Sequence, residues 1–307
     1  MTLQQIKYVL TIAEKSSMNK AAEELFISQP TLTSAVKDLE TELGITIFKR
    51  NARGTALTPS GEEFITYARQ LYQQYELLSS KYSDPTEIKL KFGVSSQHYS
   101  FAVKAFVETV KQFDLKKYEF AMREVKTLDV INDVTMLKSE IGIIYMSDFN
   151  RDIIQKILRD NGLEFHHLIN CNAYVYLWKK HPLAKNSSIT FEELADYPCL
   201  SFEQGEKGSF YFAEEILSTR EYPRTIKAAD RSTMLNLMVG LNGYTLCSGI
   251  ICEELNGNDF IAVPFETEDK NFSMQIGYIT KNGLPLSEIG KIYIHEMTEY
   301  LSKINKH

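Results

Sequence analysis

The sequence predicts two folded parts, an N-terminal helical domain with a β-hairpin and a long closing helix, and a C-terminal α/β domain of two lobes. Two observations support this. At 307 residues the chain exceeds what one hydrophobic core usually organises, and its 44% hydrophobic and 24% charged residues are typical of folded proteins. Near Asp84-Pro85 the hydrophobic pattern changes from helical spacing to short β-rich runs, and we place the main boundary there.

The first segment contains three expected helices in close succession. Apolar residues at helical spacing predict a first helix that ends near Lys15, and Asn19 is the expected N-cap of a short second helix. Ser28 is the expected N-cap of a third helix over residues 29–43, with Pro30 in the first turn, where its missing N–H costs nothing. Gly44 ends that helix. Three helices with a tight second turn make a helix-turn-helix.

The N-terminal end of the third helix is the part that enters the DNA major groove in such motifs. Its side chains carry hydrogen-bond donors suited to bases and phosphates, and the net charge of -6 means that any attraction to DNA must come from a local cluster. The residues of this segment that we predict to contact DNA are Ser28, Gln29, Pro30, Thr31, Thr33, Ser34 and Lys37.

A β-hairpin wing is expected after the third helix. Short strands over residues 45–49 and 55–57 flank Asn51-Ala52-Arg53-Gly54, which supplies the turn. Lys49, Arg50 and Arg53 cluster at this tip. Because neutralised phosphates release counterions, a basic hairpin adds affinity that does not depend on sequence, and we predict that these three residues also bind DNA.

The long helix begins at Thr58, an expected N-cap with Pro59 at the first helical position, and should run to about residue 82. Its apolar residues alternate spacings of four and three, which is a heptad seam suited to a partner helix: Phe64, Ala68, Leu71, Tyr75 and Leu78. The stripe could instead pack on its own domain. We favour a homodimer, because an exposed helix of about 25 residues needs tertiary packing to be stable.

Alternating strands and helices after residue 85 predict βαβ units on a mostly parallel sheet. We place one lobe at residues 88–164 and 269–307 and the other at 165–268. Ligands of open α/β sheets bind beyond the carboxyl ends of strands, and residues 95–98 lead from a strand into a helix, where an anion is favoured. The candidate effector-binding residues are Ser95, Ser96, Gln97, Tyr145, Ser201, Phe202, Glu203, Arg231 and Ser232.

Each of these candidates also has a purely structural interpretation. Arg231 is suited to bidentate binding of a carboxylate, but it could equally pair with a nearby acidic side chain. Each serine could simply cap a helix. The segments are therefore a firmer prediction than the individual residues.

Several short motifs together resemble the LysR-type transcriptional regulators. They are Ala21-Ala22-Glu23-Glu24-Leu25, Ile27-Ser28-Gln29-Pro30, Leu39-Glu40-Thr41-Glu42-Leu43-Gly44, Phe48-Lys49-Arg50 and Leu57-Thr58-Pro59-Ser60-Gly61. The resemblance is close over residues 1 to about 65 and looser beyond. It implies a winged helix-turn-helix that binds double-stranded DNA, and a periplasmic-binding-protein-like effector domain. Because residues 95–98 favour an anion, we expect a sequence-specific regulator controlled by a small, anionic metabolite bound between the two lobes. The resemblance also implies linker helices that pair in homodimers, which assemble into tetramers.

The chain departs from the family pattern on the recognition helix. Family members often have a basic residue at the position of Ser34 and commonly another at that of Asp38. The helix is therefore less cationic here, so that either the target sequence differs or affinity depends more on the wing and on dimer pairing.

Other function classes find less support in the sequence. An enzyme or a non-DNA small-molecule-binding protein is one alternative, but no G-x-S-x-G, P-loop, G-x-G-x-x-G or H-E-x-x-H motif occurs, and His166-His167 lies in a strand-like run where neighbours face opposite sides. A redox-sensing regulator of the same family is the second alternative, through Cys199 or Cys247.

The sequence also carries expectations about the setting of the protein. The four cysteines lack C-x-x-C spacing, which fits a reducing cytoplasm rather than a disulfide framework or a zinc site. We find no signal peptide and no apolar run long enough for a membrane span. We expect no cofactor, no metal and no catalytic residue.

Overall fold

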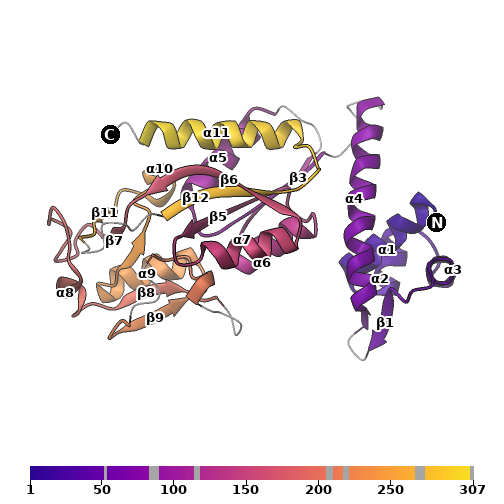
Figure 1. Cartoon of the computed structure of the whole chain (residues 1–307), viewed down its shortest axis with the longest axis horizontal. Helices are drawn as coiled ribbons and strands as arrows, with labels where there is room; N and C mark the ends of the chain where they lie inside the picture. The colour runs from indigo at the N-terminus through magenta and orange to yellow at the C-terminus, as the bar shows by residue number, and fades with distance from the viewer. Residues whose placement is uncertain are drawn as a thin grey trace. The chain divides into compact units, whose positions relative to one another are not determined.

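The computed structural model describes residues 1–51, 54–82, 90–113, 118–204, 210–216, 221–266 and 274–304. The chain forms two compact units, Met1–Lys89 and Leu90–His307, which are described separately below (Figure 1). Arg53 at the hairpin tip and the boundary expected at Asp84-Pro85 lie outside the described residues.

Three helices form the core of the first unit: α1 (Leu3–Lys15), α2 (Met18–Glu24) and α3 (Gln29–Leu43). Ser28 caps α3 through its hydroxyl, which accepts from the N–H of Thr31, and Gly44 ends the helix with a φ of 67°. The cap expected at Asn19 is wrong. Ser17 caps α2 instead, and Asn19 lies within the first turn.

The wing is an antiparallel pair of strands, β1 (Phe48–Asn51) and β2 (Gly54–Leu57). The first strand begins later than the expected residue 45, and Glu40 of α3 supplies the reason. Its carboxylate accepts the backbone N–H groups of Ile47 and Phe48 at 2.6 and 3.0 Å. These two bonds attach the start of the hairpin to the last turn of α3, so side-chain hydrogen bonds as well as the connecting chain link α3 to the wing.

The long helix α4 (Pro59–Tyr82) is capped by Thr58, whose hydroxyl accepts from the N–H of Gly61 at 2.9 Å. The expected seam has two parts. Ala68 is buried in the core of the first unit together with Ile65, and Phe64 packs against that core. Leu71, Tyr75 and Leu78 are exposed. The stripe thus packs on its own domain at the start of the helix and remains available further along.

The second unit contains a five-stranded sheet in the order β4-β3-β5-β12-β6. Its strands are β3 (Leu90–Ser96), β4 (Tyr118–Glu124), β5 (Ile141–Ser147), β6 (Leu163–Cys171) and β12 (Met274–Lys281). The expectation of a mostly parallel sheet is wrong, because β12 returns from the other lobe antiparallel to both β5 and β6. Since β6 belongs to this sheet, the first lobe also continues beyond residue 164, where the sequence placed its end.

Helices cover both faces of this sheet (Figure 1). One face packs against α5 (Ser100–Lys111) and α11 (Glu288–Ile304), and the other against α6 (Thr127–Thr135) and α7 (Arg151–Asp160). Alternation along β5 serves both layers: Ile143 and Tyr145 join the first core, and Ile144 and Met146 join the second.

The second lobe is built on β7 (Tyr174–Trp178), which lies between β10 (Thr245–Cys247) and β11 (Phe260–Pro264) in an antiparallel sheet. A parallel pair, β8 (Cys199–Phe202) and β9 (Thr225–Ala228), packs with α9 (Arg231–Leu241) around Leu200 and Met238. The remaining elements are α8 (Phe191–Leu194), a short 3-10 turn (Phe210–Phe212) and α10 (Glu253–Asn256). The chain passes between the lobes twice, after β6 and after β11.

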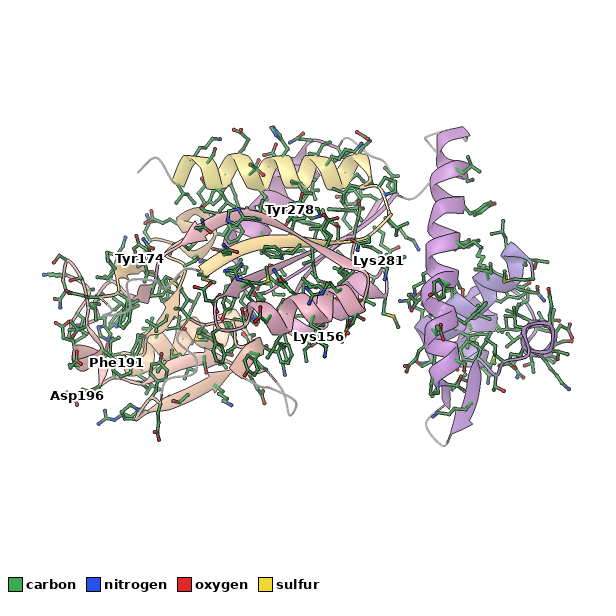
Figure 2. The ribbon with its side chains drawn as sticks, viewed as in Figure 1. Lys156, Tyr174, Phe191, Asp196, Tyr278 and Lys281 are labelled. Carbon is green, nitrogen blue, oxygen red and sulfur yellow. The ribbon has the colours of Figure 1, made fainter. Side chains whose placement is uncertain are left out.

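Tyr278 of β12, labelled in Figure 2, contacts one of the two adjacent histidines of β6. Its ring stacks on His166 of β6 with centroids 4.6 Å apart, and a ring nitrogen of His166 lies 3.0 Å from the hydroxyl of Thr280. His167 instead lies 2.9 Å from the amide oxygen of Asn170. The two histidines therefore have separate structural partners.

Candidate functional site

One candidate site is the exposed face of α3. Leu32, Val36 and Leu39 are buried and fix the helix on the core of the first unit. The opposite face exposes hydroxyls and a cation at intervals of three residues, which is close to one helical turn. The exposed predicted residues are Ser28, Pro30, Thr31, Ser34 and Lys37, whereas Gln29 and Thr33 are half-buried.

Local hydrogen bonds hold this face in one arrangement. The hydroxyls of Ser28 and Thr31 lie 2.7 Å apart, and the side-chain amide of Gln29 donates to the hydroxyl of Thr33 at 3.1 Å. Each hydroxyl retains a lone pair or a proton for an outside partner. The face therefore presents ordered donors and acceptors, as direct contact with base edges requires.

The wing contributes one described cation to this unit. Lys49 on β1 is exposed. Arg50 lies on the same strand, and the prediction for Arg53 falls outside the described residues. Lys49 is suited to contact a phosphate as a point charge.

A second candidate site is a cavity of about 90 Å³ in the Leu90–His307 unit. Residues from the segment between β3 and α5, from α5 and from β12 of the first lobe, and from β7, β8, α9 and β10 of the second, line it, so the cavity lies between the lobes. Its polar and ionisable lining residues are His98, Tyr99, Ser100, Tyr176, Glu214, Glu215, Arg231, Thr245, Cys247, Ser248 and Asn256.

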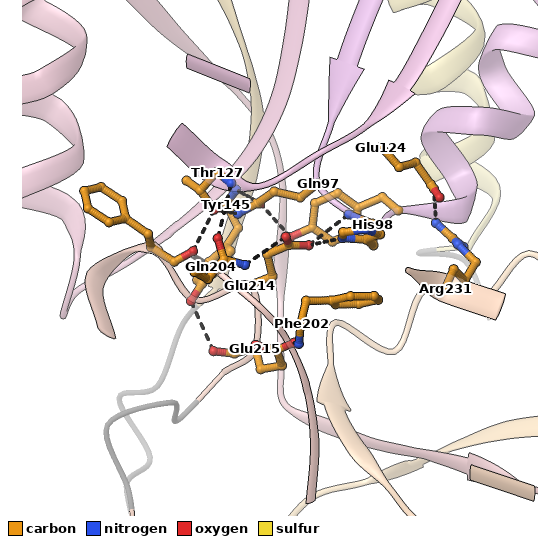
Figure 3. A network of polar contacts seen from close by, with 12 residues as sticks. Gln97, His98, Glu124, Thr127, Tyr145, Phe202, Gln204, Glu214, Glu215 and Arg231 are labelled. Carbon is orange, nitrogen blue, oxygen red and sulfur yellow. Dashed lines mark hydrogen bonds and ion pairs between the residues drawn. The ribbon is translucent and has the colours of Figure 1, made fainter. Parts of the chain in front are cut away.

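Two contacts between ionisable side chains connect the lobes beside this cavity (Figure 3). Nδ1 of His98 lies 2.8 Å from Oε2 of Glu214, and the backbone N–H of His98 donates to the same oxygen at 3.0 Å. The His98 ring also stacks on Phe202, with centroids 3.7 Å apart. On the other side, Arg231 at the start of α9 pairs with Glu124 at the end of β4.

Glu214 and Glu215 are the unusual feature of the site because both are buried. Glu214 accepts from His98 and from the side-chain amide of Gln204 at 3.0 Å. Glu215 accepts from the backbone N–H of Phe202 at 2.6 Å. Burial, together with the neighbouring charge of Glu214, raises the pKa of Glu215 to about 8.

The structure gives several of the predicted effector residues other partners. Ser95 donates to the carboxylate of Asp133 at 2.6 Å inside the first lobe, and the side chain of Gln97 donates to Thr127 at 2.5 Å. Tyr145 is buried and donates to the backbone oxygen of Glu215 at 3.2 Å. These side chains already have hydrogen-bond partners within the protein, because buried polar groups need such partners.

Of the remaining predicted effector residues, Phe202 and Arg231 line the cavity, whereas Ser96, Ser201, Glu203 and Ser232 do not. The structural alternative for Arg231 holds, since it pairs with Glu124. The sequence analysis missed Glu214 and Glu215, because adjacent glutamates normally indicate a solvated surface and nothing local marks them as buried.

The cysteine thiols lie in surroundings that oppose ionisation. Burial raises the pKa of Cys171, Cys199 and Cys247 to about 12, with the charge of Glu215 adding to the effect at Cys199. Oxidation proceeds through the thiolate, which these sites disfavour. The redox alternative therefore gains no support from these three residues.

Two further properties concern only the described part of the chain. Within it, no group of three or more His, Cys, Asp or Glu side chains is arranged to hold a metal ion. None of its helices combines the length and the apolar character that a bilayer span requires.

Comparison with known proteins agrees with this two-part architecture. Residues 3–62 match the helix-turn-helix model of bacterial regulatory proteins of the lysR family, and residues 119–300 match the LysR substrate binding domain. The chain is 29% identical over 205 residues to the transcriptional regulator AlsR of Bacillus subtilis, and 26% identical over 218 residues to CysB of Haemophilus influenzae. These alignments cover 66% and 68% of this chain, and 64% and 63% of the relatives.

Solved structures share the fold at lower identity. Full-length OxyR from Pseudomonas aeruginosa, solved as a variant, matches with a TM-score of 0.67 at 20% identity, covering 97% of this chain and 98% of OxyR. Full-length CbnR, solved in complex with its target DNA, matches with a TM-score of 0.56 at 16% identity and 99% coverage of both chains. With both family models matched in the expected order, the chain belongs to the LysR family of bacterial regulatory helix-turn-helix proteins.

Proposed function

We propose that the protein is a sequence-specific DNA-binding transcriptional regulator controlled by a small metabolite bound between the two lobes. The exposed face of α3 is the main observation, because its hydroxyls and Lys37 are ordered at helical spacing on a firmly packed helix. AlsR and CysB are themselves transcriptional regulators, and CbnR was solved with its target DNA. Such an activity requires no catalytic residue, and we propose none.

The effector part of the proposal depends on the cavity between the lobes. Contacts such as His98 with Glu214 and Arg231 with Glu124 exist only while the lobes keep their present spacing. A ligand that binds more tightly to one lobe arrangement shifts the population toward it. We propose that this shift changes the affinity or spacing of paired DNA-binding heads.

Oligomerisation and location complete the proposal. The exposed Leu71, Tyr75 and Leu78 of α4 support a homodimer, which would recognise a roughly palindromic site, and dimers of dimers would form a tetramer. Free thiols fit a reducing cytoplasm, and the cysteines that the structure describes are free: Cys171, Cys199, Cys247 and Cys252.

The direct test is to incubate the purified full-length protein with fragmented genomic DNA from its source at near-physiological salt, then recover and sequence what binds. Enrichment of a few palindromic sites supports the proposal. Uniform recovery of all fragments, both with and without metabolite extract, contradicts sequence-specific binding.

A further inference from the structure

The charges around the cavity do not balance. His98 and Arg231 are the lining residues able to carry positive charge, and both already face carboxylates: His98 faces Glu214, and Arg231 faces Glu124. Glu215 is the remaining ionisable carboxyl in the lining. Among the described residues it has no ion-pair partner. The described part of the site therefore contains one carboxyl group more than its cations can neutralise.

Among the residues that the structure describes, no further cation acts on Glu215. The ionisable groups that act on it or are influenced by it are Glu214, Tyr99, Tyr145 and Cys199, and none of them is positive when ionised. The N–H of Phe202 donates to Oε1 of Glu215, and the backbone N–H groups of Glu214 and Glu215 also favour its ionised form. Desolvation and the charge of Glu214 outweigh these N–H groups, so ionisation of Glu215 without a cationic partner is costly.

Thr245 provides an independent observation. This residue of β10 lines the same cavity and is 6% exposed, and its hydroxyl has no hydrogen-bond partner within the described part of the chain. An unpaired buried hydroxyl costs about 1–3 kcal/mol. A ligand with N–H or O–H groups can satisfy it.

Aromatic rings form much of the remaining wall. Tyr99, Tyr176 and Phe202 line the cavity together with apolar side chains from α9 and β10. The faces of aromatic rings carry partial negative charge and attract cations that have lost water. The carboxyl group of Glu215, the unpaired hydroxyl of Thr245 and the aromatic rings thus all favour a cation that can donate hydrogen bonds.

We propose that this cavity binds a small organic cation, a metabolite whose ammonium group pairs with Glu215 and donates to Thr245. The inference deepens the proposed function, since it takes the cavity as the effector site of the regulator. It reverses the charge expected from the sequence, where Arg231 and the N–H groups of residues 95–98 suggested an anion. In the structure Arg231 is paired with Glu124, and the backbone N–H of His98 is bonded to Glu214.

Size limits the ligand further. A cavity of about 150 Å³ accommodates benzene, so about 90 Å³ fits an ammonium group with a few carbon atoms. Cation binding must also be coupled to proton release, because the pKa of Glu215 lies near 8 and the pairing requires its ionised form. Affinity for a permanently charged ammonium should therefore rise with pH, at most about tenfold per unit, and level off above about pH 8.

The experiment uses the full-length protein and three probes that share one carbon skeleton: propylammonium, propanol and propionate. Calorimetric titration at millimolar concentrations measures each affinity from pH 6 to 9, a range in which an alkylammonium, titrating near the lysine value of roughly 10.4, stays charged. We expect propylammonium to bind at least tenfold more tightly than the other two, with an affinity that increases up to about pH 8. Glu215→Gln should abolish both the preference and the pH dependence, whereas Glu253→Gln, at an exposed position on α10, should change neither.

Each outcome of these titrations either supports the proposed ligand class or overturns it. Preferential binding of propionate, or affinity for propylammonium that falls with pH, overturns the inference, as does the absence of binding by any probe. Should Glu215→Gln fail to fold by circular dichroism, the pH profile of the unmodified protein still decides. Mobility-shift assays on the same preparation keep the two hypotheses apart: retained DNA binding without amine binding refutes only the ligand class, and lost DNA binding refutes the proposed function itself.

Discussion

Thr31 and Lys49 illustrate two kinds of DNA contact, one at an exposed position of a packed helix and one on a strand of the hairpin. A hydroxyl on α3 can distinguish base edges, whereas a lysine ammonium neutralises a phosphate regardless of sequence. Substitutions at the two residues should therefore change DNA binding in different ways.

Thr31→Val should alter sequence preference. The substitution keeps the β-branched shape but removes the hydroxyl that faces outward beside Ser28. We expect a loss of about 1–3 kcal/mol of discrimination at one base pair, measured by selection from a randomised site. Thr41→Val near the other end of α3 is the matched control and should leave the selected site unchanged.

Lys49→Ala should weaken binding to all DNA sequences alike. Loss of one phosphate contact lowers the slope of log affinity against log salt by about 0.9. Fluorescence anisotropy at several salt concentrations measures this slope. Lys91→Ala, at an exposed position on β3 of the other unit, is the control, and an equal effect there would contradict a specific role for the wing.

Glu215 should make thermal stability depend on pH. Its pKa is raised to about 8, so between its unfolded value near 4.3 and pH 8 the folded state retains a proton that the unfolded state releases. Stability from this group is thus full at low pH and declines as pH rises toward 8. Glu215→Gln removes the effect. Its melting temperature relative to the unmodified protein should increase between pH 5 and 8, and a constant difference would contradict the burial argument.

At the scale of the element, the most local signals gave the most accurate sequence predictions. Ser28 caps the start of α3 and Gly44 caps its end, as the sequence predicted, because a cap depends on a few neighbouring residues. The start of β1 was misplaced because Glu40, in a different element, takes the N–H groups of Ile47 and Phe48. A hydrogen bond between two elements cannot be predicted from the local sequence pattern of either one.

Gly44 offers a test of helix termination. Its φ of 67° is strained for any residue with a Cβ, so Gly44→Ala should destabilise the first unit by about 1 kcal/mol, although nothing lies within 4 Å of the added carbon. Gly240→Ala is the control, since Gly240 lies inside α9 with equally open space. That change should stabilise by roughly 0.5–1 kcal/mol. Denaturant titrations measure both, and the same sign for both would contradict the explanation.

At the scale of the whole molecule, assembly should depend on the exposed part of α4. Leu78 is 61% exposed, and glutamate at this position would place a charge in any helix pair formed there. We expect Leu78→Glu to shift the protein toward the monomer in light-scattering measurements of mass. Leu255→Glu changes an exposed leucine of α10 in the same way and should leave the mass unaltered. Unchanged assembly of the Leu78 variant would place the interface elsewhere.

The two-part architecture and a ligand site between the lobes were predictable, whereas the sheet order and the buried glutamates of the cavity were not. Helical periodicity, caps and the family motifs are local in sequence. The position of β12 between β5 and β6 depends on pairing across more than a hundred residues, for which no local pattern exists. The cavity joins residues from both lobes, and its burial of Glu214 and Glu215 follows from that non-local packing.

The position of β12 between β5 and β6 also limits when the second unit can fold during synthesis. In the completed sheet β5 pairs with β3 on one side and with β12 on the other, and β6 pairs with β12, so the sheet cannot be completed before residues 274–281 have been synthesised. The helix-turn-helix and its wing, in contrast, use only residues near the beginning of the chain and can form while translation continues. We therefore expect each nascent chain to carry a folded DNA-binding head before its effector domain is complete, while the edges of β5 and β6 that later pair with β12 are still open.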